Sequence, residues 1–224
     1  MWDRSRFSRR RRARSVRMAA VLITPGTGTA PPPGIDPGAF QSVLSEDTYD
    51  VVADLEQCAP AVAAWAERHD EADRLATAAT DLTWPGTPVL RLTGGAPLSR
   101  TLAALHDYGA DQAAVIAADA PDLPRLLIGK LFRALGSADV AVCPADGGGL
   151  VALATRIPAP AWADGVDLDT RDALARLNAA RPERRALSMV PGWHRIRTPA
   201  DISRLDPGLE GWEVTRSLLS TGRR

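Results

Sequence analysis

Apolar and polar segments alternate along the chain at strand and helix lengths. The clearest apolar segment, residues 113–118, is continuous and stops abruptly at Asp119. Runs of this kind are buried on both faces of a parallel sheet. A helix is predicted to follow at 125–135, after a turn shaped by prolines. Further strands are predicted at 19–23, 61–66, 89–92, 138–143, 150–155 and 186–190, and further helices at 39–57, 68–79, 98–108, 170–180 and 199–205.

This alternation predicts one α/β domain with a doubly wound, mostly parallel sheet flanked by helices. A chain of 224 residues is long enough for a single domain with a sizeable core. We expect that domain at 18–210, between an N-terminal tail at 1–17 and a C-terminal tail at 211–224. Residues 24–38 contain five prolines and four glycines, so they must form a loop.

The N-terminal tail is rich in arginine, with eight arginines and one aspartate in residues 1–17. Three interpretations stay open. The tail is upstream sequence read from a wrong start, with Met18 as the true start; it is a disordered segment without a role; or it is a basic arm that holds nucleic acid or anionic lipid. In all three, the tail lies outside the fold.

The lengths of the apolar runs and the number of cysteines bear on location and on disulfide or metal sites. No apolar run approaches the ~20 residues of a membrane-spanning helix, which favours a cytoplasmic location. Cys58 and Cys143 are too few for a disulfide framework or a cysteine metal site, and we expect buried free thiols.

Two carboxylates follow the central strand, where open α/β sheets bind ligands. Asp119 and Asp122 lie in a proline-stiffened turn and could hold a divalent cation. For Asp122, an equal alternative is that its side chain caps the following helix.

A second candidate loop contains Asp146 followed by Gly147, Gly148 and Gly149. The glycines allow the backbone to approach a ligand closely, and Asp146 could reach the same metal or a sugar hydroxyl. An ordinary tight turn between two strands explains the loop equally well.

Together these segments resemble a family of bacterial glycosyltransferase-A-like proteins, the selenodomain-associated transferases of the nucleotide-diphospho-sugar transferase superfamily. The resemblance covers roughly residues 19–206, is most specific in the central block, and makes this chain a divergent member. The first helix, with Glu46-Asp47-Thr48, is also similar. The segments that carry the resemblance are 119–124, 144–148, Trp162 and 198–201.

The resemblance implies a nucleotidyl- or glycosyl-transferase that depends on Mg²⁺ or Mn²⁺. Its donor would be a nucleoside triphosphate or nucleotide sugar, and its acceptor a small molecule. Asp119 would act in catalysis and, with Asp122, hold the metal, while Asp146 would orient the substrate. The substrate-binding positions implied are Thr24, Gly26, Gly28, Gly147 and Gly148. Arg195 and Arg197 are further substrate-binding candidates, because guanidinium groups attract phosphate or carboxylate.

Two departures from the family pattern count against catalysis. The family's first loop carries Lys and Arg for the donor phosphates, but no Lys or Arg occurs here between Met18 and Arg68. Where the family has Asp-x-Asp-Thr-Pro, this chain has Arg195 and Arg197 before Thr-Pro. Guanidinium groups repel a cation, so we hypothesise that Asp119 pairs with one of these arginines instead of a metal.

For the other polar residues, the sequence gives weaker evidence of a functional role. Asp169 or Thr170 is predicted to cap the following helix. His69, His106 and His194 lack the spacing of a metal site, although His194 lies beside the altered motif. No Walker sequence and no nucleophile elbow occurs.

Whether the chain is an enzyme is therefore open. The first hypothesis is the metal-dependent transferase described above. The alternative is a degenerate, catalytically inactive member that acts as a binding or partner protein. A third is a nucleic-acid- or membrane-associated protein that works through the Arg-rich tail.

Overall fold

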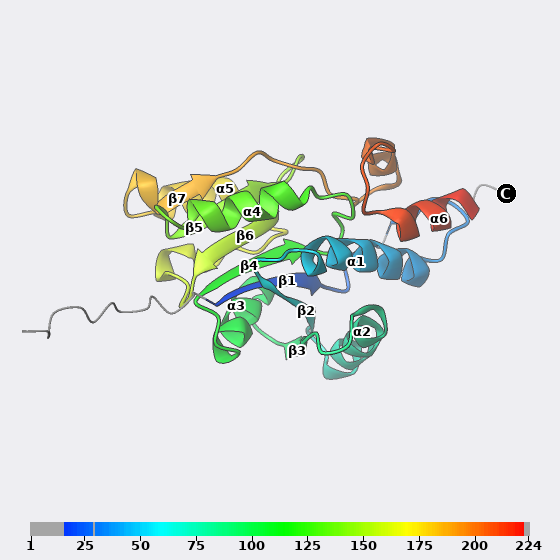
Figure 1. Cartoon of the computed structure of the whole chain (residues 1–224), viewed down its shortest axis with the longest axis horizontal. Helices are drawn as coiled ribbons and strands as arrows, with labels where there is room; N and C mark the ends of the chain where they lie inside the picture. The colour runs from blue at the N-terminus through cyan, green and yellow to red at the C-terminus, as the bar shows by residue number, and fades with distance from the viewer. Residues whose placement is uncertain (1–15, 29, 222–224) are drawn as a thin grey trace, which may run out of the picture.

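The computed structural model describes residues 16–28 and 30–221. A seven-stranded sheet in the order β3-β2-β1-β4-β6-β5-β7 forms its centre (Figure 1). Strand β6 runs antiparallel to β4 and β5, and the other pairings are parallel. The strands are β1 (Arg17–Ile23), β2 (Ala59–Ala66), β3 (Val89–Thr93), β4 (Gln112–Ala117), β5 (Val140–Pro144), β6 (Leu150–Arg156) and β7 (Leu187–Met189).

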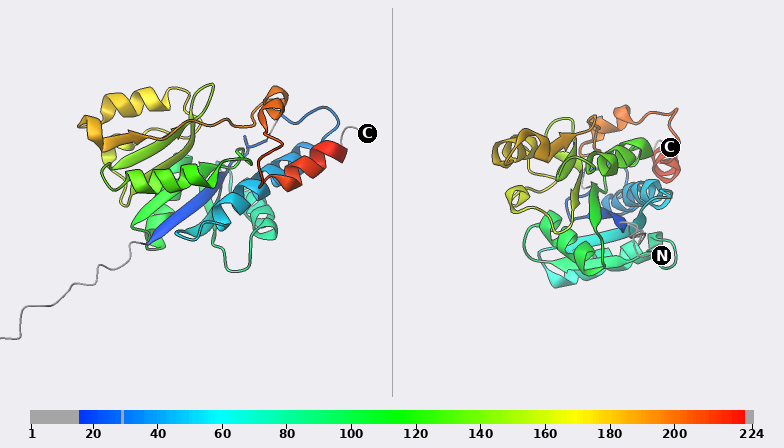
Figure 2. Two further views of the ribbon diagram at one scale, coloured as in Figure 1. Left: turned by 45° about the horizontal axis from the view of Figure 1, so that its top comes forward. Right: turned by 60° about the vertical axis from the view of Figure 1, so that its left-hand side comes forward.

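Helices cover both faces of the sheet (Figure 2). The core on one face includes side chains from α1, α2 and α4, and the core on the other includes side chains from α3 and α5. The helices are α1 (Pro37–Ala53), α2 (His69–Leu82), α3 (Pro97–Asp107), α4 (Arg125–Ala134), α5 (Ala173–Ala180) and α6 (Glu213–Thr221), with short 3-10 turns η1 (Ala161–Ala163), η2 (Arg184–Ala186) and η3 (Pro199–Arg204).

The continuous apolar strands are explained by burial on both faces. In β4, Ala114 and Ile116 belong to one core, while Ala113 and Val115 belong to the other. Successive side chains of a strand point to opposite faces, so a strand between two helical layers needs apolar residues throughout. The predicted doubly wound, mostly parallel fold is confirmed.

The N-terminal boundary lies slightly before the predicted one. Strand β1 begins at Arg17, and the Val16 backbone N–H donates to Asp111 Oδ2 at 2.8 Å. Arg17 Nε also donates to the Gln112 side-chain oxygen at 3.0 Å. The pairing of β1 with β4 therefore extends one residue into the expected tail, while residues 1–15 lie outside the described residues.

The C-terminal segment differs more from the prediction. Residues 211–224 were expected as a tail, but Glu213–Thr221 forms helix α6, which lies along α1 (Figures 1 and 2). Trp212 is buried in a small separate core with Phe40 and Leu44 of α1. Asp47 of α1 accepts hydrogen bonds from the first backbone N–H groups of α6. The sequence did not predict that 213–221 packs on α1, because the apolar residues that make this contact are sparse in the sequence.

The helix boundaries differ by a few residues in the same region. Helix α5 begins at Ala173, three residues after the predicted start, and 199–204 is a 3-10 helix.

None of the described helices is long and apolar enough to cross a membrane.

Candidate functional site

The candidate site lies where β4 and β5 end, at the edge of the sheet that also carries the end of β1. The segment 193–196 runs beside both strand ends. The Ile196 N–H donates to the Asp119 carbonyl at 2.7 Å, and the Asp146 N–H donates to the Trp193 carbonyl at 2.9 Å. These backbone bonds join residues that are 77 and 47 positions apart in the sequence.

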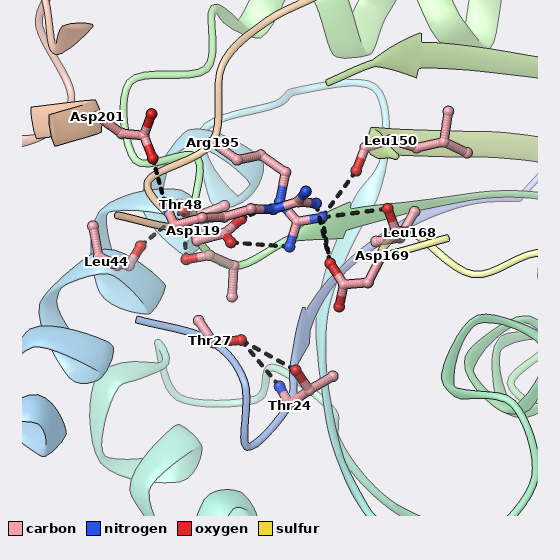
Figure 3. Close-up of polar contacts among 12 residues, drawn as sticks. Thr24, Thr27, Leu44, Thr48, Asp119, Leu150, Leu168, Asp169, Arg195 and Asp201 are labelled. Carbon is pink, nitrogen blue, oxygen red and sulfur yellow. Dashed lines mark hydrogen bonds and ion pairs between the residues drawn. The ribbon is translucent and has the colours of Figure 1, made fainter. Parts of the chain in front are cut away.

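Arg195 and Asp119 form a bidentate ion pair in this edge of the sheet (Figure 3). Arg195 Nε donates to Asp119 Oδ1 at 2.5 Å, and Nη2 donates to Oδ2 at 2.9 Å. The side chains are only 7% and 3% exposed. A planar guanidinium matches both oxygens of a carboxylate in this way, which makes the pair strong and directional.

The remaining Arg195 nitrogen is also surrounded by oxygens. Nη1 donates to the carbonyls of Leu150 and Leu168 at 3.2 and 3.4 Å, and lies 2.8 Å from Asp169 Oδ1 (Figure 3). All three guanidinium nitrogens therefore have protein acceptors. The hypothesis that Asp119 pairs with an arginine is confirmed, and the partner is Arg195.

The charges in this cluster shift the pKa values of the two arginines in opposite directions. Burial lowers the pKa of Arg195, but the carboxylates of Asp119 and Asp169 outweigh it and raise the pKa above its ordinary value. For Arg197, burial and then the nearby Arg195 charge lower the pKa. Both groups stay charged at neutral pH because arginine does not lose its proton in proteins.

Arg197 is the more accessible of the two. Its side chain is 33% exposed, Nη1 donates to the Gly148 carbonyl at 3.1 Å, and Nη2 donates to Asp169 Oδ1 at 3.1 Å. A ligand with an anionic group can reach Arg197 from solvent, whereas Arg195 is enclosed by protein oxygens.

Asp122 contacts different residues from those that Asp119 contacts. Its Oδ1 accepts from Trp193 Nε1 at 3.1 Å, and its Oδ2 lies 3.0 Å from His194 Nε2. The two atoms of the second contact are at ion-pair distance but not aligned for a hydrogen bond, and neither has another hydrogen-bond partner within the described residues. The capping alternative for Asp122 is wrong, because the residue at the N-cap of α4 is Pro124.

The glycine loop forms the hairpin between β5 and β6. Gly147, Gly148 and Gly149 all have positive φ, at 83°, 104° and 80°. A Cβ at Gly148 would lie 2.9 Å from the Arg171 carbonyl, and one at Gly149 would lie 2.6 Å from the Leu168 carbonyl. Packing within the protein thus requires glycine at these two positions, as the tight-turn alternative predicts. Gly147 faces open space.

Asp146, predicted to orient the substrate, lies at the start of this hairpin and pairs with Arg204 of η3. Its side chain is 53% exposed, so it stays accessible from solvent. Asp119 and Asp122 have other partners, Arg195 and Trp193 respectively, so the three carboxylates do not meet on one group of the protein.

The first loop is held by hydrogen bonds within the loop and by one from α1. The Thr24 N–H donates to Thr27 Oγ1 at 3.2 Å, and Gln41 of α1 donates to the Thr24 carbonyl at 2.9 Å. Gly28 has φ +65° and lies so close to α1 that a Cβ would be 3.0 Å from Gln41 Cα. This loop, which includes Gly26, lies at the end of β1, on the same edge of the sheet as Asp119.

The prediction for Asp169 and Thr170 is wrong. The N-cap position of α5 is Asp172, and Asp169 pairs with Arg195 and Arg197 instead. Thr170 Oγ1 accepts from the Asp167 N–H at 2.9 Å. Asp167 Oδ1 accepts from the Leu98 backbone N–H in the first turn of α3 at 2.7 Å. Spacing along the sequence pointed to the nearest helix. The loop instead lies beside β6, where the Leu150 N–H donates to the Leu168 carbonyl, and beside the start of α3.

Among the described residues, no group of three or more His, Cys, Asp or Glu side chains could hold a metal ion. Both oxygens of Asp119 are bound by a guanidinium, and Asp122 faces Trp193 and His194. A Mg²⁺ ion needs close oxygen ligands and would be repelled by the adjacent positive charge. These residues, as arranged, do not fit a shared metal site.

The two cysteines are not candidates for catalysis. Burial raises the pKa of the Cys58 thiol to about 11 and that of Cys143 to about 12. A reactive cysteine needs a lowered pKa, so both are inert thiols. Cys143 is buried, as predicted, while Cys58 is partly exposed.

Comparison with solved structures identifies the fold. A "putative nucleotide-diphospho-sugar transferase" from Desulfovibrio desulfuricans G20 matches with a TM-score of 0.68 and 15% identity, covering 93% of this chain and 97% of that one. A 4-diphosphocytidyl-2C-methyl-D-erythritol synthase matches at 0.53 and 16% identity, over 92% and 99%. A cytidylyltransferase from Leptospira borgpetersenii matches at 0.53 and 11%, over 94% and 95%.

No curated protein sequence matches the chain. The structural neighbours establish the nucleotide-diphospho-sugar transferase fold, so the fold that the resemblance implies is confirmed. A family model described as "Uncharacterized protein conserved in bacteria (DUF2064)" matches residues 48–170, and the chain belongs to this family.

Proposed function

We propose that this protein is a catalytically inactive member of its superfamily that acts as a binding or partner protein. The observation that supports this most strongly is the buried, bidentate pairing of Asp119 with Arg195. The carboxylate that would hold the metal in a transferase has a permanent cation of the protein in contact with both oxygens.

The charge pattern around the first loop supports the same proposal. A nucleoside triphosphate carries several negative charges, and charged donors bind phosphate most strongly. The loop after β1 has no Lys or Arg, and Arg195 is enclosed. Arg197 is the charged donor of this motif that a ligand can reach, so we expect a ligand with few negative charges, bound without a metal.

The competing proposal is the Mg²⁺- or Mn²⁺-dependent nucleotidyl- or glycosyl-transferase. Its support is the fold, which matches proteins named as nucleotidyl- or sugar transferases over more than nine-tenths of this chain. Similarity of fold at this level of identity does not carry over a reaction, because unrelated chemistries share folds. A cytoplasmic location and a nucleic-acid role for the N-terminal tail stay predictions.

A ligand and activity screen on the full chain separates the two proposals. The nucleoside triphosphates and UDP-glucose are titrated by calorimetry with and without Mg²⁺ or Mn²⁺, and pyrophosphate release is followed in parallel. We expect no metal-dependent binding and no pyrophosphate. Metal-dependent binding that is lost in Asp119→Asn, but kept in the exposed control Asp81→Asn, would establish the transferase instead.

A further inference from the structure

A pocket of about 200 Å³ lies between helix α3, strand β6 and the segment that follows β6, residues 157–164. Its walls are mainly apolar and include Leu98, Leu102, Leu153, Ile157, Pro158 and Ala163. The three leucines are buried in the core on the α3 side of the sheet, so they form the inner wall of the pocket. A dry apolar cavity of about 150 Å³ can hold benzene, so this pocket can enclose one small ring.

Three polar side chains of the lining have no partner of their own. Ser99, His106 and Asp164 make no side-chain hydrogen bond or ion pair with any other residue that the structure describes. Thr155, which also lines the pocket, already donates to the Asp139 carbonyl at 3.1 Å. His106 and Asp164 are exposed, so they lie where the pocket meets solvent. The pocket therefore combines an apolar interior with hydrogen-bonding groups at its mouth that a ligand can use.

The charge of the lining indicates which head group of a ligand fits. Asp164 is the acidic residue of the lining, and neither arginine nor lysine lines the pocket within the described residues. The Asp164 carboxylate accepts hydrogen bonds, and the Ser99 hydroxyl can accept as well as donate. An ammonium group carries three donors and no acceptor, so it matches these groups, whereas a carboxylate or phosphate would meet a like charge.

The pocket is separate from the pair of Asp119 and Arg195. Asp119, Asp169 and Arg195 are not part of its lining. The segment 164–169 reaches both places, because Asp164 lines the pocket while Asp169 contacts Arg195. A ligand in the pocket would therefore contact the same segment without touching the ion pair.

We infer that this pocket is a binding site for a small apolar amine, with the hydrocarbon part enclosed by the leucines and the ammonium group at Asp164. The inference goes beyond the proposed function, because the pocket does not contain the Asp119 site and can bind its ligand whether or not that site catalyses a reaction. The apolar walls supply affinity by burial, and the polar mouth selects the charge of the head group.

The test titrates the full chain with three ligands that share a phenylethyl group. Phenethylamine carries an ammonium group, phenethyl alcohol a hydroxyl and phenylpropionate a carboxylate. The backbone amide shifts in NMR spectra measure the affinity and locate the ligand.

We expect phenethylamine to bind with a Kd of about 0.1–1 mM, which is ordinary for a ligand of about nine non-hydrogen atoms. It should shift the amides of Leu102 and Ala163, which line the pocket. The alcohol should bind about threefold more weakly, and the carboxylate at least about tenfold more weakly, because Asp164 is exposed and solvent screens its charge in part.

Two pairs of variants assign the ligand to the pocket. In Ala103→Phe, a ring on α3 fills the pocket, so binding of phenethylamine should be lost. Ala78→Phe places the same ring at an exposed position of α2 and should leave binding unchanged. Asp164→Asn should weaken phenethylamine about three- to fivefold and leave the alcohol unchanged, while Asp81→Asn, exposed on α2, should change neither.

Three results would each overturn the inference. They are no binding of phenethylamine up to about 10 mM, binding that Ala103→Phe retains, and a carboxylate that binds as tightly as the ammonium. If Ala103→Phe does not fold, the amide shifts of the wild type decide the location, and shifts confined to other segments overturn the inference. None of these results bears on the proposed function, whereas metal-dependent nucleotide binding would overturn the proposed function and leave the pocket in place.

Discussion

Asp119 and Asp47 are both buried carboxylates, but the protein holds them in different ways. Asp119 is 2% exposed and contacts a guanidinium through both oxygens. Asp47 is 1% exposed and accepts from the backbone N–H groups of Val214 and Thr215 at 3.2 and 2.7 Å. Both carboxylates hold segments distant in sequence together, the first with a full positive charge and the second with the dipoles of a helix end.

The two carboxylates differ in how far their partners offset the cost of burying a negative charge. Burial raises the pKa of Asp47 to about 6, and the hydrogen bonds from Thr215 and Val214 lower it only in part. A helix N-terminus supplies about half a charge, whereas a guanidinium supplies a whole one. Asp47 can therefore titrate near neutral pH. Loss of the Asp119 contact would leave the buried Arg195 guanidinium with Asp169 as its remaining carboxylate partner.

Breaking the Asp119 pair should have the largest effect on stability. Asp119→Ala leaves Arg195 buried beside Asp169 alone, and loss of one partner of a buried pair costs about 3–5 kcal/mol. The double variant Asp119→Leu/Arg195→Met should lose less, because no unpaired charge stays buried. Urea unfolding of the three proteins measures the difference. A double variant less stable than Asp119→Ala would contradict this account.

The next effect concerns the loop that supports the pair. In Gly149→Ala, the new Cβ would lie 2.6 Å from the Leu168 carbonyl at a φ of +80°. We expect a loss of about 2–3 kcal/mol from strain and displacement of that carbonyl. Gly147→Ala is the control, since it has φ +83° but no atom within 4 Å of the Cβ. Equal melting temperatures for the two variants would contradict the steric explanation.

The pH dependence tests the Asp47 half of the comparison. The pKa is raised from 3.8 to about 6 on folding, so protonation favours the folded state. This contribution is fully present below about pH 4 and is lost as the pH rises through 6. Between pH 7 and 5, the wild type should gain about 1–2 kcal/mol relative to Asp47→Asn. Parallel stability curves for the two proteins would show that Asp47 does not titrate there.

The smallest effect is expected at an exposed pair of the same type. Arg91 and Asp73 lie 2.6 Å apart with side chains 50% and 57% exposed. Solvent screens such pairs, so Asp73→Ala should cost less than about 1 kcal/mol. Urea unfolding beside Asp119→Ala would show whether burial, rather than ion pairing itself, sets the size of the effect. Similar losses in both variants would contradict that conclusion.

Much of the fold could be predicted from the sequence. The run at 113–118 and the turn after it identified β4 and the position of Asp119 at the sheet edge, because local hydrophobicity and chain breakers act over short distances. Helix α6 and the Asp169 contacts were missed. Both depend on partners far along the chain, which spacing within one segment does not reveal.

The sequence by itself determined the alternation of strands and helices and the acidic turn at Asp119. It also placed Arg195 and Arg197 where the family that it resembles has carboxylates. Only the tertiary structure decided that Arg195, rather than Arg197, contacts Asp119, and that two carbonyls and Asp169 complete its surroundings. The physical reason is that a charge pair depends on where separate loops meet in space. Those positions are set by backbone hydrogen bonds between the strand ends and the 193–196 segment.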